Sequence, residues 1–163
     1  MRTVVLSAGA AALLLFGCTG PDPNLTERGT GKPEVTAEFP TNAEAGEIET
    51  AVIRVTNPGP EDMSSIVISF ARVGDPSLPH PIVEPLPGRA RAGIEDIRPE
   101  PTGESPSDAT YTFAGLAEGE STEIEFDLRI PDREGAVGNS VQIYDGAEVE
   151  RAAGVRIETE VSG

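Results

Sequence analysis

Apolar and polar residues alternate along most of the chain from residue 34 onward. The clearest runs are residues 51–55 and residues 124–130, where every second side chain is a buried-type apolar residue. Weaker runs of the same kind cover residues 35–39, 66–70, 111–116, 141–143 and 155–161. Alternation with period two places one face of a strand on a core and the other in water, as in antiparallel sheets. The pattern predicts an all-β fold.

Turn-forming residues separate these runs. Asn57-Pro58-Gly59-Pro60, Glu118-Gly119-Glu120 and residues 131–135 each follow an alternating run. Short strands at this spacing predict an antiparallel β-sandwich of about seven to nine strands over residues 34–163. The apolar phase of each strand predicts the buried core, namely Ile53, Val55, Ile68, Phe113, Ile124, Phe126, Leu128 and Ile143.

Residues 74–108 interrupt this pattern with a stretch rich in proline and glycine. Short apolar pieces at residues 82–83 and 94–97 are candidates for edge strands that cross between the sheets. Loops of this length without their own structure are uncommon in compact domains and are often functional. Two interpretations stay open: a functional insertion, or an irregular sheet-to-sheet crossover.

Residues 1–17 have the parts of an export signal. Arg2 precedes an uncharged, mostly apolar run over residues 4–16, and Gly17 supplies a small residue before Cys18. The run is too short for a mature membrane-spanning helix, which needs roughly 20 residues. The sequence predicts a segment that is removed after export.

Leu15-Phe16-Gly17-Cys18 resembles the lipobox of bacterial lipoproteins. That resemblance implies cleavage between Gly17 and Cys18 and lipidation of the Cys18 sulfur, with the protein anchored to the outer face of the bacterial cell membrane. The alternative is an ordinary signal peptide followed by an incidental cysteine. Residues 18–33, which are polar and turn-forming, would then serve as a flexible tether.

The charge and the cysteine content exclude several classes of function. The chain carries a formal charge of −16, with 28 acidic and 12 basic residues, so it would repel nucleic acid. The same charge would repel anionic headgroups, so membrane attachment has to come from the lipid. Cys18 is the only cysteine. Once it is acylated, no thiol remains for a disulfide, for thiolate catalysis or for a metal.

Candidate catalytic chemistry is sparse. His80, between two prolines, is the only histidine, and no Gly-x-Ser-x-Gly motif is present to supply a nucleophile. Zinc sites need several His or Cys ligands. Calcium could be held by carboxylates at residues 132–134 or 145–148, but neither stretch has an Asp-x-Asp-x-Asp-Gly loop. We therefore predict no enzyme activity, no metal site and no cofactor.

Basic residues in the 74–108 segment are the best candidates for binding a partner. Arg89 and Arg91 form the densest basic spot in the chain, and Arg98 and His80 lie in the same segment. Guanidinium groups bind carboxylates and other anions through two parallel hydrogen bonds. The alternative is charge balance within the segment, which also holds Glu84, Glu95 and Asp96.

Three short motifs resemble bacterial surface domains of the DUF11 and CARDB type. Residues 51–60 are similar to an alternating strand that ends in a Thr-Asn-x-Gly turn, and residues 116–121 are similar to a Leu-x-x-Gly-x-Ser turn. Asn139 occupies the place of an asparagine that opens a later strand. The resemblance implies an immunoglobulin-like β-sandwich on a bacterial surface. The chain departs from the family in having one copy and in adding residues 74–108.

The sequence as a whole predicts a non-catalytic envelope lipoprotein whose sandwich binds protein or polysaccharide neighbours. The alternative is a small-ligand or glycan-binding accessory subunit of a transporter or hydrolase. A platform of exposed aromatic rings would favour glycan binding, but Tyr111, Phe113 and Tyr144 are predicted as strand residues.

Overall fold

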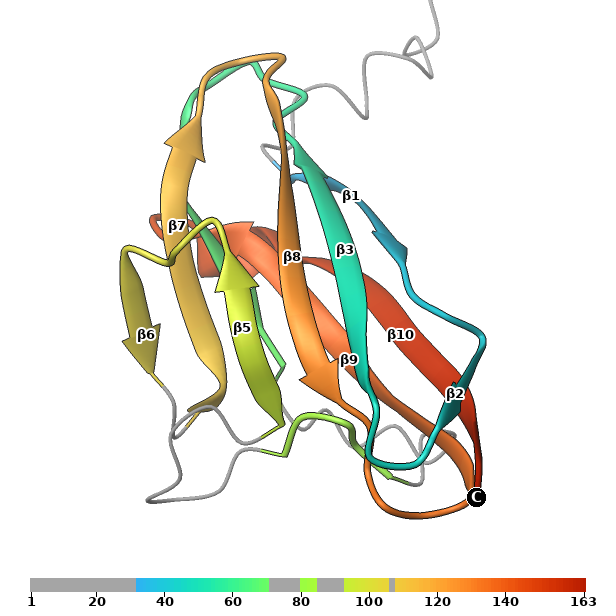
Figure 1. Cartoon of the computed structure of the whole chain (residues 1–163). Helices are drawn as coiled ribbons and strands as arrows, with labels where there is room; N and C mark the ends of the chain where they lie inside the picture. Colours follow the sequence, from blue (N-terminus) through green and yellow to red (C-terminus); the bar gives the residue numbers. More distant parts are fainter. Residues whose placement is uncertain (1–31, 71–79, 85–92, 106–107) are drawn as a thin grey trace, which may run out of the picture.

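Two β-sheets pack face to face around a single core. The computed structural model describes residues 32–70, 80–84, 93–105 and 108–163. The described elements are β1 (Glu34–Glu38), β2 (Asn42–Glu44), β3 (Ile48–Thr56), β4 (Met63–Ser69), β5 (Ile94–Arg98), β6 (Gly103–Ser105), β7 (Thr110–Leu116), β8 (Ser121–Arg129), β9 (Gly135–Asp145), the 3₁₀ helix η2 (Val149–Arg151) and β10 (Ala153–Ser162). Figure 1 shows their arrangement.

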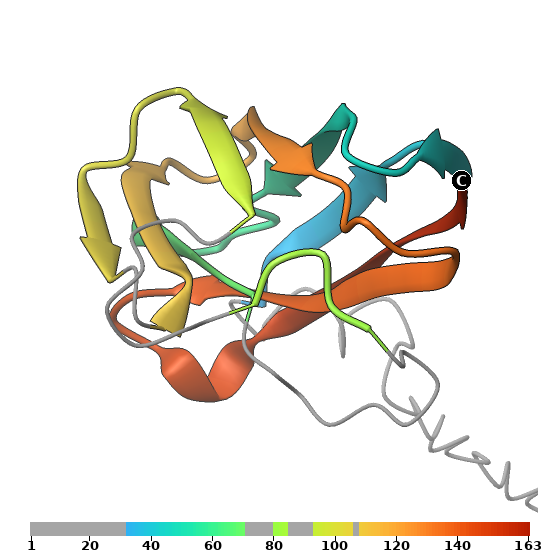
Figure 2. The same cartoon turned by 60° about the horizontal axis from the view of Figure 1, so that its bottom comes forward.

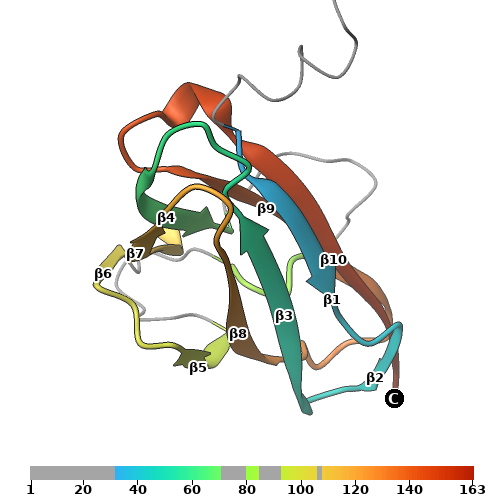
Figure 3. The same cartoon turned by 90° about the horizontal axis from the view of Figure 1, so that it is seen from above.

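The strands divide into a four-stranded and a six-stranded sheet. The first has the order β1-β3-β8-β5 and the second has the order β2-β10-β9-β4-β7-β6. Seen from above, β3 and β8 form one layer and β9 and β10 the other (Figure 3). No helix in the described ranges is long and apolar enough to cross a bilayer. The prediction of an all-β sandwich is confirmed.

The structure differs from the prediction in two details. Its described residues form ten strands rather than about seven to nine, because β2 and β6, of three residues each, carry too little alternation to be recognised. The sheets are also not wholly antiparallel, since β2 runs parallel to β10. Only three residues separate β1 from β2. The chain therefore changes sheets without reversing direction.

The apolar phase of the strands faces the core as the alternation predicts. Ile53 lies opposite Ile124 in the pairing of β3 with β8, and both are fully buried. The same register places Ala51 opposite Phe126. The prediction is confirmed for every member of the predicted core, Ile53, Val55, Ile68, Phe113, Ile124, Phe126, Leu128 and Ile143, all of which are buried.

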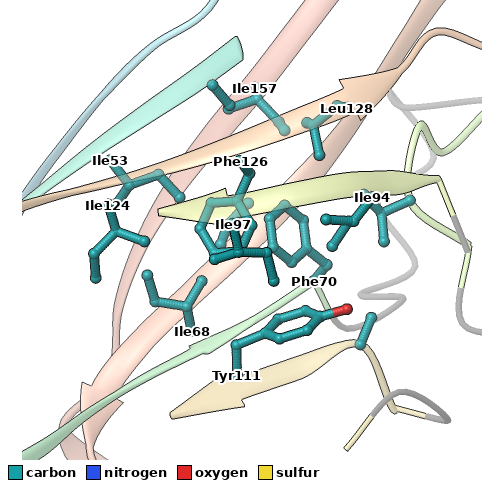
Figure 4. Close-up of a cluster of buried hydrophobic side chains, with 14 of the residues drawn as sticks. Ile53, Ile68, Phe70, Ile94, Ile97, Tyr111, Ile124, Phe126, Leu128 and Ile157 are labelled. Atoms are coloured by element: carbon teal, nitrogen blue, oxygen red, sulfur yellow. The ribbon is translucent and has the colours of Figure 1, made fainter. Parts of the chain in front are cut away.

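Phe126 joins the two sheets at the centre of the core (Figure 4). Its ring, on β8 of the four-stranded sheet, lies 5.0 Å from the ring of Phe70, 5.8 Å from Tyr111 and 6.2 Å from Phe113. Those three residues belong to or directly follow strands of the six-stranded sheet. All three contacts are edge-to-face, the geometry that aromatic quadrupoles favour.

Asn57 holds together the two turns at the upper end of the sandwich. Its side-chain Nδ2 donates to the carbonyls of Glu61 and Leu116, at 2.8 and 3.0 Å, and its Oδ1 accepts from the Gly59 amide. Its backbone amide and carbonyl bond to Glu120 and Gly119. Asn57 is 1% exposed. One buried side chain thus satisfies polar groups of both the β3–β4 and the β7–β8 connection.

We expect Phe126→Ala to lower the free energy of unfolding by about 3–5 kcal/mol, the usual cost of removing a core aromatic side chain. Ile48→Ala is the control, because Ile48 is 49% exposed on the neighbouring strand and should change stability by less than about 0.5 kcal/mol. Denaturant unfolding followed by circular dichroism measures both. A loss below about 1 kcal/mol for Phe126→Ala would contradict the central role of this ring.

Candidate interaction site at residues 74–108

The described parts of residues 74–108 belong to the sandwich. β5 forms the edge of the four-stranded sheet, β6 forms the edge of the six-stranded sheet, and residues 99–102 cross between them. Ile82, Val83, Ile94 and Ile97 are all buried in the core. In these stretches the segment is therefore the sheet-to-sheet crossover that the sequence left open as one of two interpretations.

Asn139 of β9 anchors the start of this crossover. Its Oδ1 accepts hydrogen bonds from the backbone amides of Ile82 and Val83, at 3.0 and 2.9 Å, and its Nδ2 donates to the Val83 carbonyl at 2.9 Å. The amide of Gly138 donates to the His80 carbonyl beside it. Asn139 is 5% exposed. The Asn139 side chain therefore gives residues 82–83 the hydrogen bonds that a neighbouring strand would otherwise supply. Its position in the sequence did not reveal this role.

Gly93 lies against the same two residues that Asn139 holds, Ile82 and Val83. Its φ is +90°, and a Cβ there would lie 2.6 Å from the Ile82 carbonyl oxygen and 3.4 Å from the Val83 Cα. Only glycine fits both the backbone angle and the contact. The described stretches that end at residue 84 and begin at residue 93 thus meet at this contact. Arg89 and Arg91, between them in the sequence, lie outside the described residues.

Arg98, the third candidate arginine, is engaged by its own sheet. Its guanidinium bonds to Glu125 at 2.9 Å, to Asp96 at 2.6 Å and to both oxygens of Asp127, at 2.8 and 2.9 Å. The hydrogen bonds from Arg98 and then from Thr50 lower the pKa of Asp127. The same carboxylates, Asp127 first, raise the pKa of Arg98. Arg98 thus forms an ion pair with Asp96 of its own segment, as in the charge-balance alternative, but its other two partners lie on β8, outside that segment.

Two further ion pairs lie on the outer face of the four-stranded sheet. Arg129 Nε donates to Glu95 at 2.7 Å, which lowers the pKa of Glu95, and Arg54 pairs with Glu123. All four side chains are at least 41% exposed. Solvent screens such exposed pairs, so they contribute little to the stability of the fold. Their main effect is to balance charge on this outer face.

His80 is half-buried at the base of the crossover, where its carbonyl accepts the Gly138 bond. His80 and Arg98 belong to the same segment of the sequence, but the structure places them beside different sheets. Arg98 closes β5 on the four-stranded sheet, whereas His80 lies beside β9 of the other sheet.

Asp145 and Asp132 come from the two stretches in which the sequence offered candidate calcium ligands. The Asp145 carboxylate is partly desolvated, which opposes ionisation, but hydrogen bonds from the Ser64 hydroxyl and from the amides of Ala147, Ser64 and Ser65 outweigh this and lower its pKa. Asp132 lies in the β8–β9 turn. Across the described ranges, no group of three or more His, Cys, Asp or Glu side chains is placed to hold a metal ion.

The aromatic residues do not form a platform in the described part of the chain. Tyr111 is fully buried and Phe113 is 3% exposed, both inside the core. Tyr144 is half-buried and lies on the outer face of the six-stranded sheet, because Ile143 before it points inward.

The crossover base lies at the opposite end of the sandwich from the start of β1. Glu34 pairs with Thr56, at the end where Asn57 closes the turns. Gly93 bonds to Arg129, which pairs with Ile48 at the other end of the nine-residue strand β3. Nine strand residues span about 30 Å. Figure 1 shows residues 80–84 in light green at the lower end, and Figure 2 brings that end forward.

No family model and no curated protein matches the sequence. Solved structures show a weak likeness to it, with TM-scores below 0.5. The Salmonella SafD adhesin covers 81% of this chain and 99% of its own at 14% identity, with a TM-score of 0.49. A CARDB domain from Pyrococcus furiosus covers 80% and 94% at 13% identity, with a TM-score of 0.47. The strand order itself shows a sandwich of two β-sheets, and its assignment as immunoglobulin-like stays a prediction. The resemblance to DUF11 and CARDB sequences stays a prediction.

We expect Asn139→Ala to lower the free energy of unfolding by about 3 kcal/mol, because it leaves the amides of Ile82 and Val83 and the Val83 carbonyl without a partner. Asn42→Ala is the matched control, since the Asn42 side chain is exposed and donates a hydrogen bond to its sequence neighbour Thr41. Denaturant unfolding measures both. Equal effects of the two substitutions would contradict the anchoring role of Asn139.

Proposed function

We propose that this protein is a non-catalytic interaction domain of the bacterial envelope, anchored to the outer face of the cell membrane through a lipid on Cys18. The sequence Leu15-Phe16-Gly17-Cys18 is the observation that carries the proposal, together with a tether over residues 18–33 that leads into a β-sandwich. Two acyl chains would anchor it stably, because each buried methylene contributes about 0.8 kcal/mol and one chain alone binds only marginally.

The positions of the chain segments support an outward-facing binding end. The tether enters at Glu34, so the end of the sandwich closed by Asn57 would face the membrane. The contact of Gly93 with Ile82 and Val83 lies about 30 Å farther along the strands. A lipid anchor would therefore place this contact, and the ends of the described stretches beside it, away from the bilayer.

Arg89 and Arg91 are the proposed contacts to the partner. They place two guanidinium groups in a chain whose formal charge is −16, and in the sequence they lie between two stretches that meet where Gly93 contacts Ile82. An acidic surface of a neighbouring envelope protein or polysaccharide fits these groups.

Cys18→Ala tests the anchor. We expect the substituted protein to leave the membrane fraction or to accumulate unprocessed, because no sulfur is left to accept lipid. Cell fractionation and mass measurement of the product follow the outcome, with Ser7→Ala in the signal segment as the control that should be processed and anchored normally. A Cys18→Ala protein that is found mature-sized and detergent-extractable in membranes would overturn the lipoprotein proposal.

Arg89→Ala combined with Arg91→Ala tests the binding loop. We expect crosslinking in intact cells to recover less partner and the remainder to be less sensitive to salt, because screening acts chiefly on exposed charges. Arg133→Ala is the control for the loss of one exposed arginine elsewhere. The same partners at the same yield from the double variant would place the binding surface elsewhere.

A further inference from the structure

The first two strands form one continuous arm that bonds to both sheets. β1 is the outer strand of the four-stranded sheet, and β2 is the outer strand of the six-stranded sheet. The chain keeps its direction as it passes from one to the other, since β1 runs antiparallel to β3 and β2 runs parallel to β10. We call residues 34–44 the N-terminal arm. Figure 1 shows it along one side of the sandwich.

The two ends of β3 show which of its backbone groups face the arm. The Ile130 amide donates to the carbonyl of Glu47, directly before β3, at 2.8 Å. The amide of Asn57, directly after β3, donates to the Glu120 carbonyl at 2.9 Å. Both bonds join β3 to the ends of β8. Because backbone groups alternate in direction along a strand, the odd-numbered residues of β3 face β8 and the even-numbered residues face β1.

This register identifies the residues that hold β1 in place. Thr36 lies opposite Arg54, an even-numbered residue of β3, so the backbone groups of Thr36 bond to β3. The same holds for Glu34 and Glu38, the two ends of β1. The backbone groups of Ala37 point away from β3. Three of the five residues of β1 therefore form its ladder of hydrogen bonds.

The second half of the arm is fixed to the other sheet. The Glu160 amide of β10 donates to the carbonyl of Thr41 at 3.0 Å, directly before β2. The amide of Ala45, directly after β2, donates to the carbonyl of Ser162 at 3.2 Å. These bonds enclose the three residue pairs of β2 with β10. Separating the arm from the sandwich therefore requires breaking bonds to both sheets.

Apolar side chains of the arm contact the core between the sheets. Val35, Ala37 and Phe39 are half-buried and pack against the core. Ala43 of β2 is 7% exposed and belongs to the core itself. These contacts add to the backbone bonds on either side of them.

The direction of the arm decides how it responds to a pull. It begins at Glu34, at the end of the sandwich that Asn57 closes, and runs toward the opposite end. The hydrogen bonds of an antiparallel pair are perpendicular to the strands. A pull along the strands therefore loads the bonds of β1 together, whereas a pull across them breaks the bonds one after another. Because the arm does not reverse between the sheets, the same lengthwise pull also acts along β2.

We propose that the N-terminal arm is a load-bearing clamp, which carries tension from the membrane anchor into both sheets when a partner holds the opposite end of the sandwich. The inference rests on the proposed function, because a lipid on Cys18 determines the end at which tension enters. The predicted tether leads directly into Glu34, so the arm is the first part of the sandwich to take the load. A strand paired in one sheet alone would pass the load to that sheet only.

Single-molecule force spectroscopy on the full chain made without lipid tests the proposal, with one handle on the free Cys18 thiol. Arg133→Cys places the second handle in the exposed β8–β9 turn, so that force acts along the arm. Glu61→Cys places it in the exposed β3–β4 turn, so that force acts across the start of the arm. We expect the lengthwise pull to need at least about twofold more force to release the arm, because it loads the β1 bonds together. Freeing residues 34–44 lengthens the chain by up to about 40 Å, which identifies the event.

A matched pair of proline substitutions tests the ladder itself. Thr36→Pro removes an amide hydrogen that faces β3, whereas Ala37→Pro removes one that points away from it. We expect Thr36→Pro to lower the release force in the lengthwise pull and Ala37→Pro to leave it unchanged. Circular dichroism of each variant checks that the sandwich is folded.

Two outcomes would overturn the proposal: the same release force in both directions of pulling, or the same loss of force in both proline variants. The comparison of directions uses an unsubstituted arm, so it decides the question even where Thr36→Pro fails to fold. No lipid takes part in this measurement. Failure of the clamp is therefore distinguishable from failure of the Cys18 experiment.

Discussion

The contact of Phe126 with three rings of the opposite sheet is the interaction on which the rest of the structure depends. The two sheets of a sandwich must be held together, and the only cysteine of this chain, Cys18, precedes the first described strand in the sequence. Phe126 meets Phe70, Tyr111 and Phe113 edge-to-face at the centre of the core. The aliphatic side chains around them fill the interior that these rings define. Packing alone therefore fixes the distance between the outer faces.

Two buried asparagines form hydrogen bonds with backbone groups that have no partner in a neighbouring strand. Every connection between the sheets takes backbone groups away from a strand ladder, and each buried group needs another partner. Asn57 supplies partners where β3 and β7 leave their sheets, and Asn139 supplies them where residues 82–83 cross. Both are neutral, so their burial carries none of the cost of a buried charge. The ends of the sandwich are thus closed by amides rather than by covalent bonds.

The outer faces of the two sheets differ in how many charged side chains they carry. On the four-stranded sheet, arginines are paired with carboxylates of adjacent strands, and Arg98 alone contacts three of them. At the centre of the six-stranded sheet, the outward positions carry uncharged side chains instead, among them Val67, Ser69 and Gln142. A partner on the first face would have to compete with ion pairs already formed.

The alternation of residues by itself determined the all-β class, the strands of the core and the identity of the buried side chains, because period-two burial is a local property of each strand. The sequence by itself also shows that residues 15–18 resemble a lipobox, because this likeness depends on a short motif and not on the fold. Only the tertiary structure decided that β2 joins β10 in parallel, that Arg98 pairs with Asp127 and that Asn139 holds residues 82–83. Those contacts join residues far apart in the chain, or strands too short to show a pattern. Their partners are set by how the two sheets pack.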